Sequence, residues 1–237
     1  MKLEAASEVF EAAATHWGGR HDCAVITMEE LVEAVDRRFA VRLPELAVWP
    51  DPHDGRPPAD EEYSRTTNPE RWRILGARVD AWVAALAAAG LASVEDVAVD
   101  DIQWEESPHT RMSSAVRVIP SAIGARPMVV ARSQIGDVPE TGITLGWGDP
   151  AVLVGLFPYC GCDACDDGAQ RDLDAVDERL SSIVSGGYRR LTNGNRRVTE
   201  EASYGWTAAG EWADGEVEAV LADPTGWEEQ SGASWLT

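Results

Sequence analysis

The amino-acid sequence predicts an α+β fold in which a mainly antiparallel sheet is covered by N-terminal helices and by one later amphipathic helix. Three observations support this prediction. Helical patterns fill the chain as far as Gly90, short β-rich segments separated by Gly, Pro and Asp follow, and a second long helical pattern begins near Asp166. No repeat or composition shift divides the chain, so we expect residues 1–237 to form a single domain.

Three helices are expected in the first third of the chain. Residues 5–19 place apolar side chains on one face and end at a Gly-Gly pair, which predicts a helix within a possible N-terminal extension, residues 1–26. The second helix begins at Thr27, where the sequence TMEE supplies a capping box. The third begins at Asn68 as its capping residue, continues through an apolar stripe and ends at Gly90.

The β-rich segments occupy residues 94–104, 113–121, 126–134, 141–147 and 151–158. Their regular spacing predicts an antiparallel sheet. The last segment is ambiguous, because Asp149-Pro150 can equally begin a short helix. An amphipathic helix at 166–185 comes next, followed by a hairpin whose type I′ turn is formed by Asn193-Gly194. A short helix at 214–223 precedes the C-terminus.

Charge and lysine content exclude several classes of function. The formal net charge of −21 repels phosphate backbones, so we expect no nucleic-acid partner. Solubility is the simplest role for this charge, and a basic protein partner is the alternative. The single lysine, Lys2, excludes both a P-loop lysine and an internal Schiff-base lysine.

The sequence shows no targeting or membrane segment. No run near the N-terminus is long enough for a signal-peptide core, and the longest apolar run, residues 81–92, is too short to span a bilayer. We therefore expect no membrane contact and a cytoplasmic location, where cysteines stay reduced or bind metal.

Three of the four cysteines, Cys160, Cys162 and Cys165, fall within the six-residue sequence CGCDAC. The C-x2-C spacing suits zinc and the first cysteine can add a third thiolate, so zinc is a possible cofactor. A fourth ligand is not evident; Cys23 and His53 are the leading candidates, and His109 and the neighbouring Asp163 and Asp166 are the others. Two other interpretations stay open: a redox thiol at a helix N-terminus, and small buried cysteines that anchor the turn between sheet and helix.

A long connection rich in proline and acids, residues 43–65, separates the second and third helices. A connection of this length in a compact domain is either functional or flexible. Its carboxylates and histidine can bind a hard metal or act as general acid and base, whereas the simpler interpretation is a stiffened surface loop with solvated acids. The candidate binding residues are Trp49, Asp51, His53, Asp54, Glu62, Tyr63 and Arg65.

Five segments together carry a resemblance. They are WPDPHDGRPPADEEYSR at 49–65, NPERWRILGARVDAWV at 68–83, FPYCGCDACD at 157–166, SGGYRRL at 185–191 and SGASWL at 231–236. In this combination the chain, from about Met28 onward, resembles a family of uncharacterised proteins from high-GC Gram-positive bacteria. The resemblance implies a cytoplasmic bacterial protein, and it carries no activity, substrate or catalytic residue.

We therefore expect a binding or regulatory module, rather than an enzyme, with a cysteine turn that can hold a structural metal. One alternative is an enzyme that uses the loop at 51–65 together with the cysteine turn, which predicts His53 or Glu62 near Cys162. The other is an acidic interaction protein, similar to an immunity protein, that binds a basic partner in a salt-sensitive manner.

Overall fold

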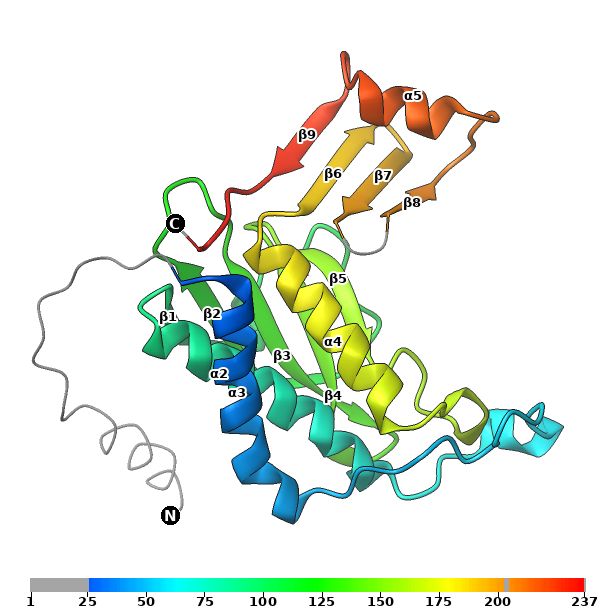
Figure 1. Ribbon diagram of the computed structural model, residues 1–237. Coiled ribbons are helices and arrows are strands. Elements are labelled where there is room, and N and C mark those ends of the chain that lie inside the picture. Colours follow the sequence, from blue (N-terminus) through cyan, green and yellow to red (C-terminus); the bar gives the residue numbers. More distant parts are fainter. Residues whose placement is uncertain (1–25, 203–204, 237) are drawn as a thin grey trace, which may run out of the picture.

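The computed structural model describes residues 26–202 and 205–236, which form two antiparallel sheets with helices packed on the larger one (Figure 1). The predicted α+β class is confirmed. The α-helices are α2 (Met28–Arg42), α3 (Arg73–Ala88), α4 (Ala169–Val184) and α5 (Glu216–Ala222), and the short 3-10 helices are η1 (Leu43–Glu45), η2 (Asp60–Ser64), η3 (Pro69–Trp72), η4 (Val99–Asp101) and η5 (Asp163–Cys165). The helix expected at 5–19, most of the possible extension 1–26, and Cys23 lie outside the described residues.

The capping box predicted the start of α2 correctly. The Thr27 side chain accepts a hydrogen bond from the backbone N–H of Glu30, and the Glu30 carboxylate accepts one from the backbone N–H of Thr27. Two of the N–H groups that a helix start leaves unpaired are thereby satisfied. The apolar side chains of Leu31, Val35 and Phe39 then point into the core.

The predicted start of α3 was wrong, and its predicted end was right. Asn68 adopts a left-handed conformation (φ 48°) and its side chain does not cap a helix; η3 intervenes, and α3 begins only at Arg73. At the other end Gly90 has φ +72°, and the N–H of Leu91 reaches back to the carbonyl of Leu86 at 3.0 Å. This is the ending that a glycine after the last helical residue favours.

Helix α3 lies at the centre of the helical layer, between α2 and α4, and is buried on nearly all sides (Figure 1). Its buried Arg78 joins the three helices, because the guanidinium pairs with Asp36 of α2 at 2.8 Å and with Asp177 of α4 at 2.6 Å. Within the described ranges, no helix combines the length and apolar character needed to cross a bilayer.

The larger sheet is a meander of five strands in sequence order: β1 (Ala92–Val97), β2 (Met112–Pro120), β3 (Met128–Ile135), β4 (Val138–Trp147) and β5 (Val152–Phe157). The ambiguous segment at 151–158 is thus a strand, and it pairs with β4 from the Trp147–Val152 register onward. Val118, Val130 and Leu145 on one face join the main core beneath the helices. The edge strand β5 leads directly into the cysteine turn.

A second sheet, in the order β8-β7-β6-β9, holds β6 (Tyr188–Asn193), β7 (Arg196–Glu201), β8 (Gly205–Ala209) and β9 (Glu228–Ser231). The β6–β7 hairpin was predicted, but its turn lies one residue later than expected. Asn193 pairs with Arg196, so the two central residues are Gly194 and Asn195. Of these only Gly194 has positive φ, which fits a type II′ turn with glycine first and excludes type I′.

The C-terminal segment folds back onto the end of α4. The N–H of Trp235 donates to the carbonyl of Val184 at 2.8 Å, and the Trp235 side chain is 1% exposed. Gly186 makes this approach possible, because it has φ +74° and a Cβ there would lie 2.7 Å from the backbone nitrogen of Ser234. Two of the quoted segments, SGGYRRL and SGASWL, are therefore packed against each other.

Candidate metal centre

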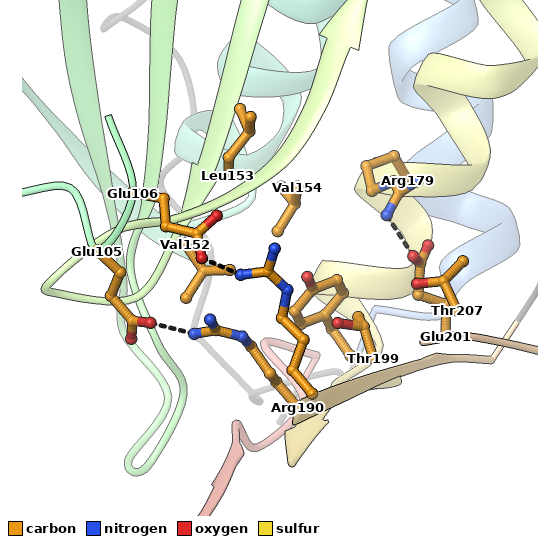
Figure 2. A pocket seen from close by; sticks show the side chains of 12 residues that line it. Glu105, Glu106, Val152, Leu153, Val154, Arg179, Arg190, Thr199, Glu201 and Thr207 are labelled. Atoms are coloured by element: carbon orange, nitrogen blue, oxygen red, sulfur yellow. Dashed lines mark hydrogen bonds and ion pairs between the residues drawn. The ribbon is translucent and has the colours of Figure 1, made fainter. Parts of the chain in front are cut away.

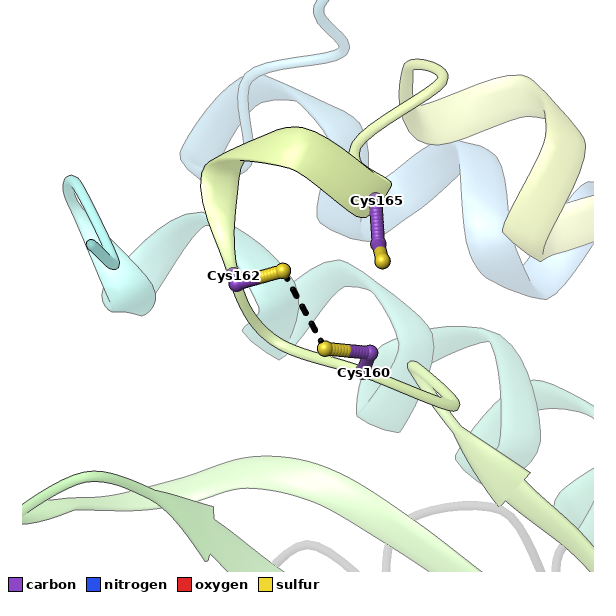
Figure 3. A group of neighbouring side chains, drawn as sticks. All are labelled: Cys160, Cys162 and Cys165. Carbon is purple, nitrogen blue, oxygen red and sulfur yellow. Dashed lines mark hydrogen bonds between the residues drawn. The ribbon is translucent and has the colours of Figure 1, made fainter. Parts of the chain in front are cut away.

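The three thiols of CGCDAC converge on one point in the turn between β5 and α4 (Figure 3). The Sγ atoms of Cys160, Cys162 and Cys165 all lie within 4.8 Å of one another, and those of Cys160 and Cys162 are 3.2 Å apart. Tetrahedral zinc with Zn–S bonds of ~2.3 Å would hold its sulfur atoms about 3.8 Å apart. The three cysteines are thus close enough to bind a metal ion.

Two of the three thiols, Cys162 and Cys165, have pKa values shifted in opposite directions. Burial favours a raised pKa for Cys162, but hydrogen bonds from the thiols of Cys160 and Cys165 outweigh it and lower the pKa below the usual value. The same hydrogen bond with Cys162, together with burial, raises the pKa of Cys165 to about 12. Cys162 is therefore the thiol that its neighbours help to deprotonate, and a cation placed among the three sulfur atoms would replace those two donors.

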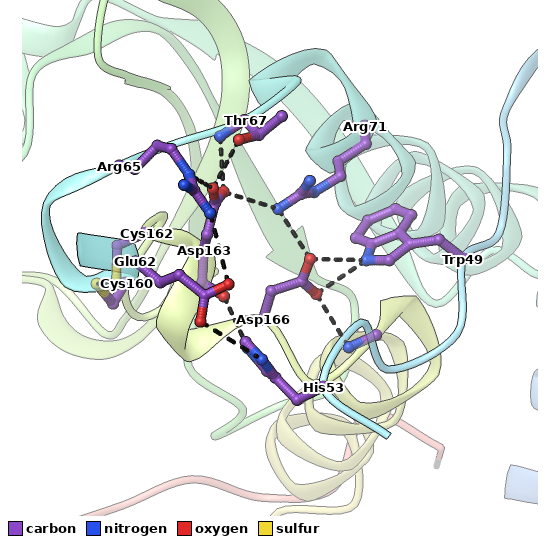
Figure 4. A network of polar contacts seen from close by, with 11 residues as sticks. Trp49, His53, Glu62, Arg65, Thr67, Arg71, Cys160, Cys162, Asp163 and Asp166 are labelled. Atoms are coloured by element: carbon purple, nitrogen blue, oxygen red, sulfur yellow. Dashed lines mark hydrogen bonds and ion pairs between the residues drawn. The ribbon is translucent and has the colours of Figure 1, made fainter. Parts of the chain in front are cut away.

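Asp163, inside the turn, anchors the far end of the long loop (Figure 4). Its carboxylate accepts hydrogen bonds from Nε of Arg65 at 2.7 Å and from the N–H and hydroxyl of Thr67, both at 2.6 Å. Burial alone would raise the pKa of Asp163, yet these donors outweigh it and lower the pKa to about 2. The backbone N–H of Asp163 also donates to the carbonyl of Arg65 at 2.8 Å.

Asp166 anchors the near end of the same loop. Only 1% of its side chain is exposed, and its carboxylate accepts from the indole Nε1 of Trp49 at 2.8 Å and from the N–H of Gly168 at 2.9 Å. It also pairs with Nη2 of Arg71 at 2.8 Å. The loop backbone packs so closely here that a Cβ at Gly168 (φ +88°) would lie 2.7 Å from the nitrogen of Asp51.

His53 is buried at the centre of this contact rather than at the thiols. Its Nε2 lies 3.0 Å from the carbonyl oxygen of Asp163, and its Nδ1 lies 3.8 Å from a carboxylate oxygen of Glu62. Both ring nitrogens thus face oxygen atoms of the loop and the turn. In the described part of the chain, the group of potential ligands around the thiols contains the three cysteines and does not include His53.

The remaining loop candidates support the loop itself. Asp51 accepts from the N–H of His53 at 2.7 Å, and this bond is the main cause of its lowered pKa. Glu62 accepts from the N–H of Ala59 at 2.7 Å and starts η2. Asp54, with φ 50°, and Tyr63, 60% exposed, have solvent-exposed side chains.

The cysteine cluster forms part of the wall of an open groove of about 810 Å³. Cys160 and Cys165 line one end of it, and the exposed Tyr159 stands beside them. Another part of the wall carries Asp167, which precedes α4, and Arg171, Asp172, Asp174 and Glu178 of α4. The side of the cluster that faces away from the turn therefore opens to solvent.

The sequence interpretation missed the partners that hold the turn. Thr67 and Arg71 were not singled out, and Asp163 and Asp166 were considered as acids beside the thiols and as possible metal ligands, not as partners of the loop. One signal was available: carboxylates in a turn that packs on the core need cationic or N–H partners, and Arg65 ends the loop while Arg71 follows it. Their roughly hundred-residue separation from the turn kept that pairing out of reach of local patterns.

Comparisons with known proteins identify one similarity. A search of curated proteins and a search of solved structures return no match. A family model described as "Family of unknown function (DUF6226)" matches residues 35–235, which include the loop, the cysteine turn and the C-terminal segment. The chain therefore belongs to this family of unknown function.

Proposed function

We propose that this protein is a metal-binding module whose CGCDAC turn holds one Zn²⁺ through the thiolates of Cys160, Cys162 and Cys165. The observation that carries the proposal is the convergence of the three sulfur atoms within 4.8 Å. Soft thiolate ligands select Zn²⁺ or Cu⁺ over Mg²⁺ and Ca²⁺, and the neighbouring carboxylates that a hard cation would need are already bound to the loop.

The fourth coordination position is open to the groove in this proposal. Closed structural zinc sites use four protein ligands, whereas sites with three keep a position for water or another ligand. Cys160 and Cys165 line the groove, so a small molecule can reach a cation held between them.

A regulatory role follows from what the turn carries. Asp163 and Asp166 lie within and just after the C-x2-C segment and bind both ends of the loop 49–67. Metal binding would fix the turn and thereby the loop, and metal loss would loosen both, since binding energy at such sites is also folding energy.

Metal analysis with matched variants tests this proposal. Protein purified without added zinc should contain about one Zn²⁺ per chain. Cys162→Ser should contain almost none, and Cys23→Ser, which changes the fourth cysteine of the sequence, should retain it. Wild-type protein without bound metal, and without Co²⁺ or Cd²⁺ thiolate absorption on titration, would overturn the proposal. Loss of metal in Cys23→Ser would instead show a closed four-thiolate site.

A Lewis-acid hydrolase is the second candidate, because an acid with a near-neutral pKa lines the same groove. Burial, and then the charge of Asp166, raise the pKa of Asp172 to about 6. Such a carboxyl group can act as a general base at neutral pH beside a metal with an open position. Asp172→Asn should then retain zinc and lose any hydrolysis of model esters that the wild type shows; a wild type inactive with zinc bound would exclude this candidate for those esters.

A further inference from the structure

A second cavity, of about 300 Å³, lies between the edge strand β5 and one face of the small sheet (Figure 2). Val152 and Val154 of β5 form one wall. Arg197, Thr199 and Glu201 alternate along β7, so all three side chains project from the same face of that strand toward the cavity. The cavity therefore combines an apolar wall with a row of polar groups, as small-molecule sites do.

One carboxylate in this cavity is incompletely paired. The side chain of Glu201 is 5% exposed; Oε1 pairs with Arg179, whereas Oε2 has no hydrogen-bond partner among the described residues. A buried acceptor left unsatisfied costs about 1–3 kcal/mol, and more when it is charged. Burial, which outweighs the pairing with Arg179, raises the pKa of Glu201. The cavity thus presents a buried site for a hydrogen-bond donor or a cation.

Two further guanidinium groups, those of Arg190 and Arg197, also line the cavity. Arg190, 6% exposed, and Arg197 use Nη1 to bind the carboxylates of Glu105 and Glu106. A guanidinium carries five N–H donors in a fixed fork, so each retains donors for a second acceptor. Arg197 and Glu201 are four residues apart on one strand, which separates their Cα atoms by about 13 Å.

The cavity is lined by equal numbers of acidic and basic side chains. Three glutamates and three arginines are present: Glu105, Glu106, Glu201, Arg179, Arg190 and Arg197. A simple anion would meet both the glutamates and the field of a chain with net charge −21, and a simple cation would meet three guanidinium groups. A ligand that carries both charges fits both ends. The volume corresponds to about ten water-sized groups at ~30 Å³ each.

We propose that this cavity binds a small zwitterion of the size of an α-amino acid or dipeptide. Its ammonium group donates to Oε2 of Glu201, its carboxylate accepts from Arg190 and Arg197, and its side chain lies against Val152 and Val154. The site is independent of the metal centre, so Cys162→Ser should leave it intact.

Calorimetry with matched probes tests the proposal. The probes are the twenty α-amino acids and a set of dipeptides, each paired with its N-acetyl and C-terminal amide derivative. At least one zwitterion should bind the wild type, and either derivative should bind at least tenfold more weakly. Absence of binding by every zwitterion to folded protein would overturn the proposal and leave water as the occupant, and equal binding of the N-acetyl form would overturn the role of Glu201.

Binding measurements on variants test which residues hold each end of the ligand. Glu201→Gln and Arg197→Gln should each weaken binding of the zwitterion at least tenfold. Arg196→Gln is the matched control, because Arg196 precedes Arg197 but projects from the opposite face, against Trp212 and Trp227. If Glu201→Gln does not fold, Arg197→Gln alone decides, since that side chain is 37% exposed. Unchanged affinity in Arg197→Gln, or an equal loss in Arg196→Gln, would contradict the assignment.

Discussion

Replacing Asp166 by Asn should destabilise the protein far more than the same change at its neighbour Asp167. Both changes remove one negative charge from the same turn. Asp166 is 1% exposed and pairs with Arg71, whose side chain is 18% exposed. Asp167 is 42% exposed and pairs with Arg171, which is 70% exposed. The two variants therefore separate a buried ion pair from a surface ion pair in one segment.

The size of this destabilisation follows from the loss of the ion pair between Arg71 and Asp166. Breaking a buried ion pair by removing one partner costs about 3–5 kcal/mol, because the other charge stays buried. Asp163 lies 3.7 Å from the same Nη2 and offsets part of this loss, and Asn can still accept from Trp49. We therefore expect Asp166→Asn to lower the free energy of unfolding by about 2–4 kcal/mol. Asp167→Asn should change it by less than about 0.5 kcal/mol.

Urea unfolding followed by tryptophan fluorescence measures both variants. Trypsin cleavage after Arg65 provides a local measurement, because release of the loop from the turn should speed cleavage in Asp166→Asn and leave Asp167→Asn unchanged. Equal unfolding free energies for the two variants, or equal cleavage rates, would refute the view that Asp166 holds the loop.

Three further predictions concern acid stability and the C-terminal contact. The pKa of Asp163 is about 2 in the folded protein, below the ~3.9 of an unfolded chain, so its contribution of about 1–2 kcal/mol is present above pH ~4 and lost as pH falls toward 2. Urea midpoints from pH 5 to 2 should fall less steeply in Asp163→Asn. Gly186→Ala should lower the free energy of unfolding more than Gly194→Ala. Both glycines have positive φ, but only a Cβ at position 186 would lie against backbone atoms, at Ser234. Equal urea midpoints for the two variants would contradict this. Trp235→Ala should lower the free energy of unfolding, measured in urea, by about 3–5 kcal/mol, because Trp235 is buried. Trp206 is 44% exposed, so Trp206→Ala should lower it by less than about 0.5 kcal/mol.

Local signals predicted the elements that local interactions determine. The hydrogen bonds between Thr27 and Glu30 begin α2, and the positive φ of Gly90 ends α3; both depend on residues within one helical turn. The prediction at Asn68 was wrong because the Asn68 carbonyl instead accepts from the N–H of Arg71, which produces a 3-10 turn before the α-helix. The sequence pattern used to place the helix start does not show whether this local hydrogen bond forms instead.

Long-range pairing was the part that the sequence patterns did not reveal. A single sheet was expected, yet β6–β9 form a sheet of their own, in which β9, near the C-terminus, pairs with β6. Similarly, the sequence connected the loop with the cysteine turn only through His53 and Glu62, and not through the acids of the turn. Asp163 and Asp166 join them through contacts to residues about a hundred positions earlier. The candidate residues could be identified from their residue types, but their interaction partners became visible only in the folded structure.

X-ray absorption at the zinc edge tests the central claim, the open thiolate site, most directly. For protein with one bound Zn²⁺, the account predicts three sulfur atoms at ~2.3 Å and one nitrogen or oxygen atom at ~2.0 Å. The light ligand should be replaced by sulfur when a small thiol is added, since Cys160 and Cys165 line the groove. A shell of four sulfur atoms in the untreated protein, or a shell without sulfur, would contradict it.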